Sequence, residues 1–307
     1  MGGSRHAEPT LSRERIDRDA ATLVCHARRL KQRGWRGLVW LNGAPAQARQ
    51  QALALWQAAD WQAPLWVGDA QQAPVSASLS SRKARTRLGA EHQLVILDAS
   101  GHEGLDPDAL GALAGTVSAG GLLVLMTPSA WGSQPDPNYA RFADYPWPWE
   151  HLSAHYLARL ARLLRASNQV VRWPVGGALR LPILGKRPSA PEPSEDADCL
   201  SADQALAVSA LVKLKRRRPL VVTADRGRGK SAALGIACAR LLQQSDGGEW
   251  LLTAPRLSAV ESVFNRVAAL CPALQRHGPA EVSLANGSRL RFLPPDVLTE
   301  LVEQGTL

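Results

Sequence analysis

The chain has 307 residues, of which 45% are hydrophobic and 21% charged, and its formal net charge is +9. This composition is typical of a globular protein rather than a disordered one, and no apolar run approaches the roughly 18 to 20 residues of a membrane span, so we expect two globular domains in the cytoplasm. The positive charge favours a nucleic acid partner, whose phosphates release counterions when they are neutralised, although a compositional bias toward arginine would give the same excess.

The first half of the sequence alternates between short apolar segments and longer amphipathic ones. Helices are predicted over residues 16–33, 46–59 and 107–117, and strands over residues 37–41, 64–67, 93–99 and 121–127. This order is typical of an α/β domain built on a parallel sheet. A further helix, predicted over residues 150–165, closes the domain.

Some polar and aromatic residues of this half allow two interpretations each. Asp98 ends the strongest strand, where α/β sheets bind ligands, but an aspartate there is also a common turn or cap residue. The basic run 82–87 either contacts phosphates or forms a solvated helix face. Trp131, Trp147 and Trp149 lie in a Pro-rich stretch. They could stack on nucleobases, but packing over the core is favoured.

The histidines and cysteines carry no strong metal or disulfide signature. His151 and His155 stand four apart in a predicted helix, without a third metal ligand nearby. The cysteines form no CxxC pair, so we expect reduced thiols at Cys25, Cys199, Cys238 and Cys271.

Residues 185–199 are polar and rich in Pro, Glu and Ser, which is typical of a linker. The sequence therefore predicts an N-terminal parallel-sheet α/β domain over residues 1–184, a linker over 185–199, and an incomplete RecA-like P-loop domain over 200–307. In this last domain, helices are predicted over residues 202–216, 230–243 and 258–270. Strands are predicted over residues 220–223 and 250–253.

A segment between a predicted strand and a predicted helix has the form of a phosphate-binding P-loop: Ala224-Asp225-Arg226-Gly227-Arg228-Gly229-Lys230-Ser231. Its glycines let backbone N–H groups turn toward an anion at the start of the helix. Lys230 is expected to reach the β- and γ-phosphates, and Ser231 to bind the bridging magnesium ion. Ala224 replaces the usual first glycine, a variant that keeps the turn if its φ is negative. The motif predicts ATP with magnesium as the ligand, and a glycine-rich structural turn is the alternative.

Two further segments bear on nucleotide chemistry. Gln204 lies on the helix before the predicted strand, and its amide offers the donor and acceptor that the adenine edge requires. The alternative is that Gln204 is a surface residue of an amphipathic helix. Residues 275–280 loosely match the pyrophosphate loop of GNAT acetyltransferases. We exclude that interpretation because such a loop opens a helix, whereas here Pro279 removes a donor and strand-like residues follow.

Both halves of the sequence resemble the bacterial tRNA(Met) cytidine acetyltransferases. The resemblance rests on residues 200–204, on residues 218–235 with their R-G-R-G-K-S loop, and upstream on residues 88–91, 94–99 and 120–125. It implies an enzyme that uses ATP and acetyl-CoA to acetylate N(4) of the wobble cytidine in elongator tRNA(Met). It also assigns an adenine contact to Gln204 and the phosphate loop to Arg226, Gly227, Arg228, Gly229, Lys230, Ser231, Ala232, Ala233, Leu234 and Gly235.

The sequence departs from this family at its end. Members continue past residues 290–296 into a strand with the Walker B carboxylates and then into an acetyltransferase module, whereas this sequence stops at Leu307. We therefore expect a fragment that binds ATP but has no catalytic residue of its own and no acetyl-CoA site. Two alternatives stay open, a nucleic acid remodelling ATPase without acetyl transfer and a non-catalytic nucleotide-binding scaffold.

Overall fold

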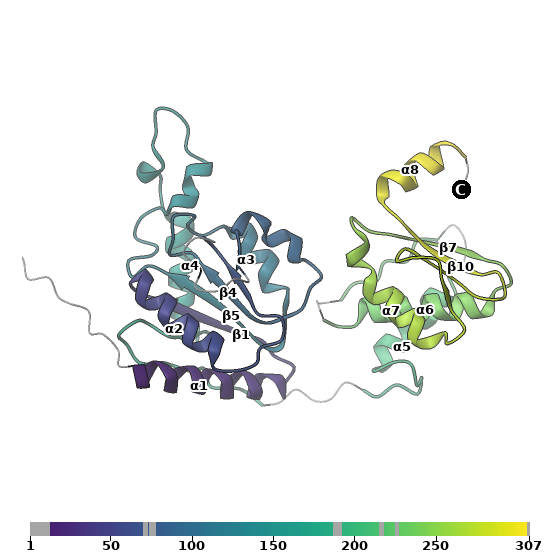
Figure 1. Ribbon diagram of the computed structural model, residues 1–307, viewed down its shortest axis with the longest axis horizontal. Helices are drawn as coiled ribbons and strands as arrows, with labels where there is room; N and C mark the ends of the chain where they lie inside the picture. Colours follow the sequence, from purple (N-terminus) through teal and green to yellow (C-terminus); the bar gives the residue numbers. More distant parts are fainter. Residues whose placement is uncertain are drawn as a thin grey trace, which may run out of the picture. The chain divides into compact units, whose positions relative to one another are not determined.

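The structure is a computed structural model that describes residues 13–69, 73, 78–186, 192–214, 218–224 and 227–305. The chain divides into two compact units, Met1–Pro188 (unit 1) and Ser189–Leu307 (unit 2). Each unit combines helices with a sheet of its own (Figure 1). The predicted α/β class is confirmed.

Unit 1 is built on a parallel sheet. Its described strands have the order β3-β2-β4-β5-β1-β6, and every pairing between them is parallel. The strands are β1 (Gly37–Asn42), β2 (Leu65–Val67), β3 (Ser78–Leu79), β4 (His92–Asp98), β5 (Val117–Thr127) and β6 (Val171–Arg172). The helices are α1 (Arg13–Lys31), α2 (Pro45–Gln57), α3 (Pro107–Ala114) and α4 (His155–Ala166), with short 3-10 turns at Ser81–Arg87, Pro137–Arg141 and Trp149–His151.

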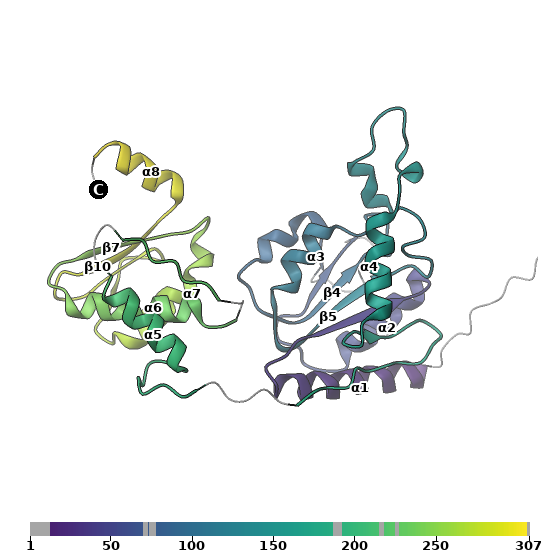
Figure 2. The same ribbon diagram turned by 180° about the vertical axis from the view of Figure 1, so that it is seen from behind.

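Both faces of this sheet are covered by helices. Along β4, Leu94 and Ile96 belong to the core beneath α1 and α2, while Val95 and Leu97 belong to the core beneath α3 and α4. Figures 1 and 2 show these two pairs of helices on opposite sides of the sheet. Because neither face meets water, the centre of the strand, Leu94–Leu97, is a continuous apolar run rather than an alternating one. The predicted strands and helices of this unit are confirmed, with shifts of a few residues at their ends.

The Pro-rich stretch contains tryptophans in different environments. Trp131 is 4% exposed and packs at 6.5 Å from the ring of Trp40, as the packing interpretation predicts. Trp147 is 65% exposed, so the same prediction is wrong for it. The helix that follows starts at His155 rather than at 150, because residues 149–151 form a separate 3-10 turn after Pro148.

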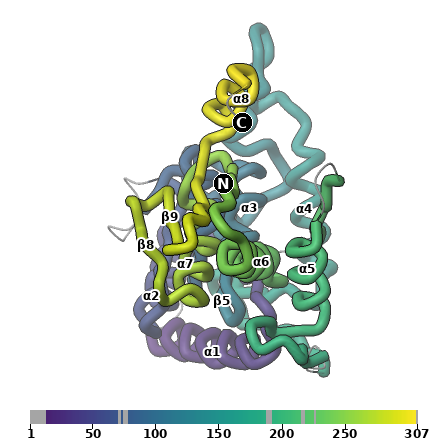
Figure 3. Tube along the Cα trace, turned by 90° about the vertical axis from the view of Figure 1, so that its right-hand side faces the viewer, coloured from purple at the N-terminus to yellow at the C-terminus, as the bar shows by residue number. Residues whose placement is uncertain are grey.

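Unit 2 has a smaller, mixed sheet in the order β7-β10-β9-β8. Strand β10 runs parallel to β7 and antiparallel to β9. The strands are β7 (Glu249–Thr253), β8 (Gln275–Arg276), β9 (Glu281–Ser283) and β10 (Arg289–Leu293), and the helices are α5 (Ala202–Val212), α6 (Lys230–Gln244), α7 (Glu261–Leu270) and α8 (Pro295–Glu303). Figure 3 shows α8 standing away from the other helices of the unit, and none of its residues is buried.

The predicted strand over residues 220–223 is wrong. This segment has no regular secondary structure, and Val221 is 80% exposed. Apolar, β-branched residues form a strand only where a neighbouring strand accepts and donates the ladder hydrogen bonds. No described strand pairs with residues 220–223, so the chain enters the glycine-rich loop as an exposed, irregular segment.

Candidate nucleotide-binding site

The N-terminus of α6 has the features of an anion site. The helix begins at Lys230 after Gly229, whose φ of 81° and ψ of 17° place it in the left-handed region, and no side chain caps it. Ser201 caps α5 and Asp106 caps α3 through hydrogen bonds to backbone N–H groups, whereas α2, α4, α7 and α8 have no side-chain cap, like α6. The first N–H groups of a helix have no partner within it, so the uncapped end of α6 offers donors and the positive end of the helix dipole to an anion.

The loop before α6 folds back on itself around two glycines. Gly227 has a φ of 80° and Gly229 one of 81°, conformations that cost other residues roughly 1 to 2 kcal/mol. The ammonium group of Lys230 donates a hydrogen bond to the carbonyl oxygen of Ala224, across the loop. Arg228 and Ser231 are exposed beside it, while Asp225 and Arg226 lie outside the described residues.

The first turns of α6 supply packing as well as polar groups. Ala233 is 3% exposed and belongs to a core cluster with Ile236 on α6 and Val208 on α5. Gly235 is buried where α6 meets α7, and a Cβ at this position would lie 2.7 Å from Cβ of Arg266. Ala232 and Leu234 are partly exposed. Among the predicted loop residues, Ala233 and Gly235 therefore hold α6 in place, whereas Gly227–Ser231 surround its N-terminus.

Gln204 contacts the loop directly and is not an exposed surface residue. Its side chain is 8% exposed and lies at the third position of α5. Its Oε1 accepts a hydrogen bond from the N–H of Leu200 at 2.7 Å, and its Nε2 donates to the carbonyl oxygen of Gly229 at 3.3 Å. The structure thus brings together two predicted site residues that are 25 positions apart in the sequence.

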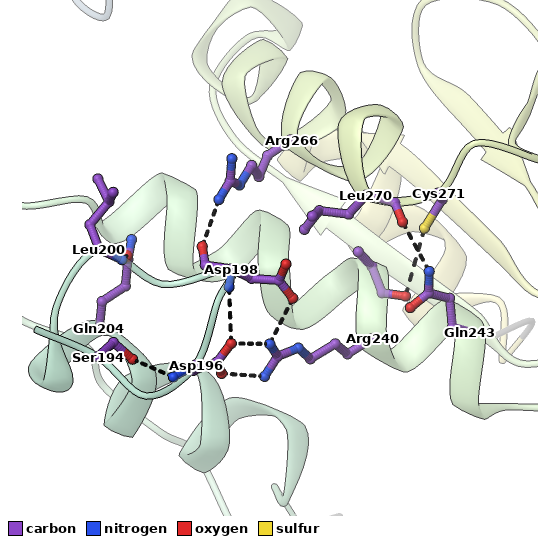
Figure 4. A network of polar contacts seen from close by, with 11 residues as sticks. Ser194, Asp196, Asp198, Leu200, Gln204, Arg240, Gln243, Arg266, Leu270 and Cys271 are labelled. Carbon is purple, nitrogen blue, oxygen red and sulfur yellow. Dashed lines mark hydrogen bonds and ion pairs between the residues drawn. The ribbon is translucent and has the colours of Figure 1, made fainter.

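A network of charged residues next to this site was not found by sequence reasoning. It consists of Asp196, Asp198, Arg240 and Arg266, which we call the Arg240 network (Figure 4). Arg240 on α6 donates to both carboxylate oxygens of Asp196 at 2.8 and 2.6 Å and to Asp198 at 2.8 Å. Arg266 on α7 donates to the backbone carbonyl oxygen of Asp198 at 2.6 Å.

The electrostatics of the network follow from this geometry. Hydrogen bonds from Arg240 lower the pKa of Asp196 to about 2, and the two carboxylates raise the pKa of the Arg240 guanidinium. The ion pair is therefore fully charged at neutral pH. In the sequence, Asp196 and Asp198 belong to a polar, Pro-rich run that is typical of a linker, and the arginine they bind lies more than 40 positions downstream. No local pattern reports such a pairing.

The carboxyl edge of the sheet in unit 1 is occupied by the protein's own side chains. Asp98 is 3% exposed, receives a hydrogen bond from Arg49 at 2.8 Å, and accepts two more from the N–H and hydroxyl groups of Ser100. Here the turn and cap interpretation of Asp98 describes the structure. After β1, a Cβ on Gly43 would lie 2.3 Å from Cβ of Val175, and α2 begins with Pro45, which has no N–H to offer.

The remaining candidates do not assemble into a site. In the basic run, Arg85 binds Asp108 at 2.7 Å and its neighbours Arg82, Lys83 and Arg87 are exposed. Residues 275–280 begin in β8 and lead into β9, so the strand expected after them is confirmed and they do not open a helix. In the described part of the chain, no three metal-binding side chains cluster and no helix is long and apolar enough to cross a bilayer. All four cysteines are free thiols.

The α/β fold and the glycine-rich loop at α6 are those of a nucleotide-binding α/β protein, and the match to a helicase domain given below is consistent with a RecA-like fold. Comparison with known proteins gives the family. The family model "tRNA(Met) cytidine acetyltransferase TmcA, N-terminal" matches residues 19–175. The family model "RNA cytidine acetyltransferase NAT10/TcmA, helicase domain" matches residues 221–307. The chain belongs to the tRNA(Met) cytidine acetyltransferase family, so the resemblance of its sequence is confirmed.

Individual relatives agree with these matches. A tRNA(Met) cytidine acetyltransferase from Nitrosococcus halophilus is 37% identical over 305 residues, which cover 94% of this chain and 39% of the relative. Proteins of the same name from Pectobacterium atrosepticum and Citrobacter koseri are 32% and 33% identical, and the matches cover 90% and 88% of this chain. The chain spans between about a third and two fifths of the length of these relatives.

Proposed function

We propose that this chain provides the N-terminal α/β unit and the ATP-binding part of a tRNA(Met) cytidine acetyltransferase. The whole reaction uses ATP and acetyl-CoA to form N(4)-acetylcytidine at the wobble position of elongator tRNA(Met), in the cytoplasm. Family membership of both units supports the reaction class. The names of the relatives support tRNA as the substrate, and the net charge of +9 favours a polyanionic partner.

The observation that carries the ATP-binding part is the uncapped N-terminus of α6, with Lys230 at its first position and two left-handed glycines before it. A triphosphate with its magnesium ion would bring the negative charge that this end of the helix lacks. The N–H groups of the first turn would bind phosphate oxygens, and Lys230 would exchange the Ala224 carbonyl for a phosphate. Ser231 is exposed at the second position of the helix and would hold the magnesium ion.

The second contribution is recognition of the base by Gln204. Its amide nitrogen already contacts Gly229, so the side chain lies at the edge of the phosphate loop. Adenine offers a donor at N6 and an acceptor at N7, and an amide can pair with both at once. Oε1 has a second lone pair and Nε2 a second hydrogen, so Gln204 would contact the base with these and keep its bonds to Leu200 and Gly229.

The proposal is tested in cells that carry the gene in its natural place. We would replace Lys230 with alanine in the chromosome and measure N(4)-acetylcytidine in purified elongator tRNA(Met) by mass spectrometry. Lys186→Ala, which removes an exposed lysine of unit 1, is the matched control. We expect the modification to fall at least ten-fold in the Lys230 variant and to stay unchanged in the control.

The alternatives predict other results. If deletion of the whole gene leaves acetylcytidine in this tRNA unchanged, the acetyltransferase proposal is wrong. Loss of RNA-stimulated ATP turnover in the Lys230 variant, with acetylcytidine unaffected, would favour the remodelling ATPase instead. Binding of ATP to the purified chain that is the same in wild type and Lys230→Ala would refute the role of the loop.

A further inference from the structure

The segment between residues 192 and 201 is tied to the P-loop helix by side chains rather than by secondary structure. The bidentate contact of Arg240 with Asp196 holds the start of this segment on α6. The contacts of Arg240 and Arg266 with Asp198 hold its middle between α6 and α7. The side chain of Asp196 also accepts a hydrogen bond from the N–H of Asp198 at 3.2 Å, so the two aspartates lie in one turn (Figure 4).

The far end of the same segment positions Gln204. The carbonyl oxygen of Asp196 accepts from the N–H of Cys199 at 3.0 Å, and Leu200, the next residue, donates to Oε1 of Gln204. Ser201 then caps the helix that carries Gln204. A displacement of Asp196 or Asp198 is therefore passed within four residues to the group that orients the Gln204 amide.

The phosphate end of the site is connected to the same helix. Lys230 and Arg240 both lie on α6, so this helix carries the phosphate-binding end and the anchor of the Gln204 segment. Gln204 connects the segment to the phosphate-binding end of α6, since its Nε2 donates a hydrogen bond to the carbonyl oxygen of Gly229. The geometry closes a ring from Gly229 along α6 to Arg240, through the segment to Leu200, and through Gln204 back to Gly229.

We propose that Arg240, acting through Asp196 and Asp198, is a positioning residue for base selection, because it fixes the segment from which Gln204 contacts the base. This inference rests on the proposed ATP-binding function. A positioning role and a general stabilising role of Arg240 predict different affinities for ligands that lack adenine. A ligand that uses only the phosphate loop does not depend on the orientation of the Gln204 amide.

The test compares three ligands on the full chain. Dissociation constants for ATP, GTP and inorganic tripolyphosphate, each with magnesium, are measured by calorimetry on wild type, Arg240→Met, Arg240→Lys, Asp198→Asn and Gln204→Ala. Arg291→Met is the matched control, because it removes a guanidinium that pairs with Glu249 in the same unit at 3.5 Å. Hydrogen exchange of the α6 amides confirms that each variant is folded.

Arg240→Met and Gln204→Ala should each weaken ATP binding about ten-fold, which is the loss of about one good hydrogen bond. Their combination should be no weaker than either alone, because both remove the same contact. Arg240→Lys and Asp198→Asn keep part of the network and should lose about three-fold. Binding of GTP and of tripolyphosphate should stay within two-fold in all of these variants, as should every ligand in Arg291→Met.

Several results would overturn the inference. Equal weakening of all three ligands would show that Arg240 only stabilises the fold, and unchanged ATP binding would show that it positions nothing. A wild type that binds ATP and GTP equally would also refute base selection, while leaving the phosphate loop intact. Failure of the proposed ATP-binding function would give a different result: wild type and Lys230→Ala would bind tripolyphosphate equally. Should Arg240→Met not fold, Arg240→Lys and Asp198→Asn decide by the same criteria.

Discussion

Replacing Gly229 with alanine separates backbone strain from loss of the contact with Gln204. Gly229 has a φ of 81°, and an ideal Cβ there would lie 2.9 Å from Nε2 of Gln204. Gly247 is a close match for the first property alone, because its φ is 76° and its Cβ would meet nothing within 4 Å. A comparison of Gly229→Ala with Gly247→Ala therefore isolates the effect of the contact.

The two substitutions should cost different free energies of unfolding. The left-handed conformation costs an alanine roughly 1 to 2 kcal/mol, of which about 0.5 kcal/mol is offset because alanine also restricts the unfolded chain. Both variants should therefore lose about 1 kcal/mol. At Gly229 the new methyl group also displaces the Gln204 amide from its 3.3 Å hydrogen bond, which adds about 1 kcal/mol. We expect about 2 kcal/mol for Gly229→Ala against about 1 kcal/mol for Gly247→Ala.

Hydrogen exchange is the suitable assay, because the chain has two units and a single unfolding curve would mix them. Mass spectrometry of peptides from α6 reports the opening free energy of unit 2 alone. Calorimetry on the same samples gives the affinity for ATP. We expect ATP binding to weaken about ten-fold in Gly229→Ala and to be unchanged in Gly247→Ala.

Either of two results would contradict the expected difference between Gly229→Ala and Gly247→Ala. Equal losses of opening free energy in both variants would mean that Gln204 gains nothing from Gly229. Equal loss of ATP affinity would mean that nucleotide binding follows stability rather than the local contact.

Three further predictions concern other parts of the molecule. Arg240 lowers the pKa of Asp196 from 3.8 to about 2, so its contribution, about 1 kcal/mol for a partly exposed pair, is present above pH 4 and lost as the pH falls from about 4 through 2. The difference in α6 opening free energy between wild type and Asp196→Asn should shrink to zero over that interval. Arg49→Met leaves buried Asp98 without its cation and should destabilise unit 1 by about 3 kcal/mol, seen as faster exchange in β4, with ATP affinity unchanged. Trp131→Ala should cost about 3 to 5 kcal/mol in the same assay, whereas Trp147→Ala should cost less than about 0.5 kcal/mol, because only the first ring is buried.

The sequence predicts the elements of unit 1 well because each of them is marked locally. Strand β4, for example, contains the continuous apolar run Leu94–Leu97 before Asp98, and the helices between the strands repeat their apolar residues at helical spacing. The order of the strands in the sheet is not marked in this way. Nor is the pairing of Arg49 with Asp98, which joins residues 49 positions apart.

In unit 2 the local signals are less reliable. Residues 220–223 have strand composition, but without a described partner strand they are exposed and irregular. Residues 192–199 have linker composition, yet Asp196 and Asp198 are bound to α6. The structure of both segments depends on residues far away in the sequence, which local composition does not report. Residues 220–223 lack a described partner strand, and residues 196–198 have a partner in Arg240. The P-loop was recognisable because its glycines, lysine and helix lie within one short stretch.

The closed carboxyl edge of unit 1 has a consequence for stoichiometry. Two α/β units in one chain would suggest two nucleotides per molecule. In unit 1, however, both oxygens of Asp98 are bound within the protein, Val175 packs against Gly43, and Pro45 starts the adjacent helix without a donor. Among the described residues this edge therefore offers no second phosphate site, and a titration of this chain should saturate at one equivalent of ATP.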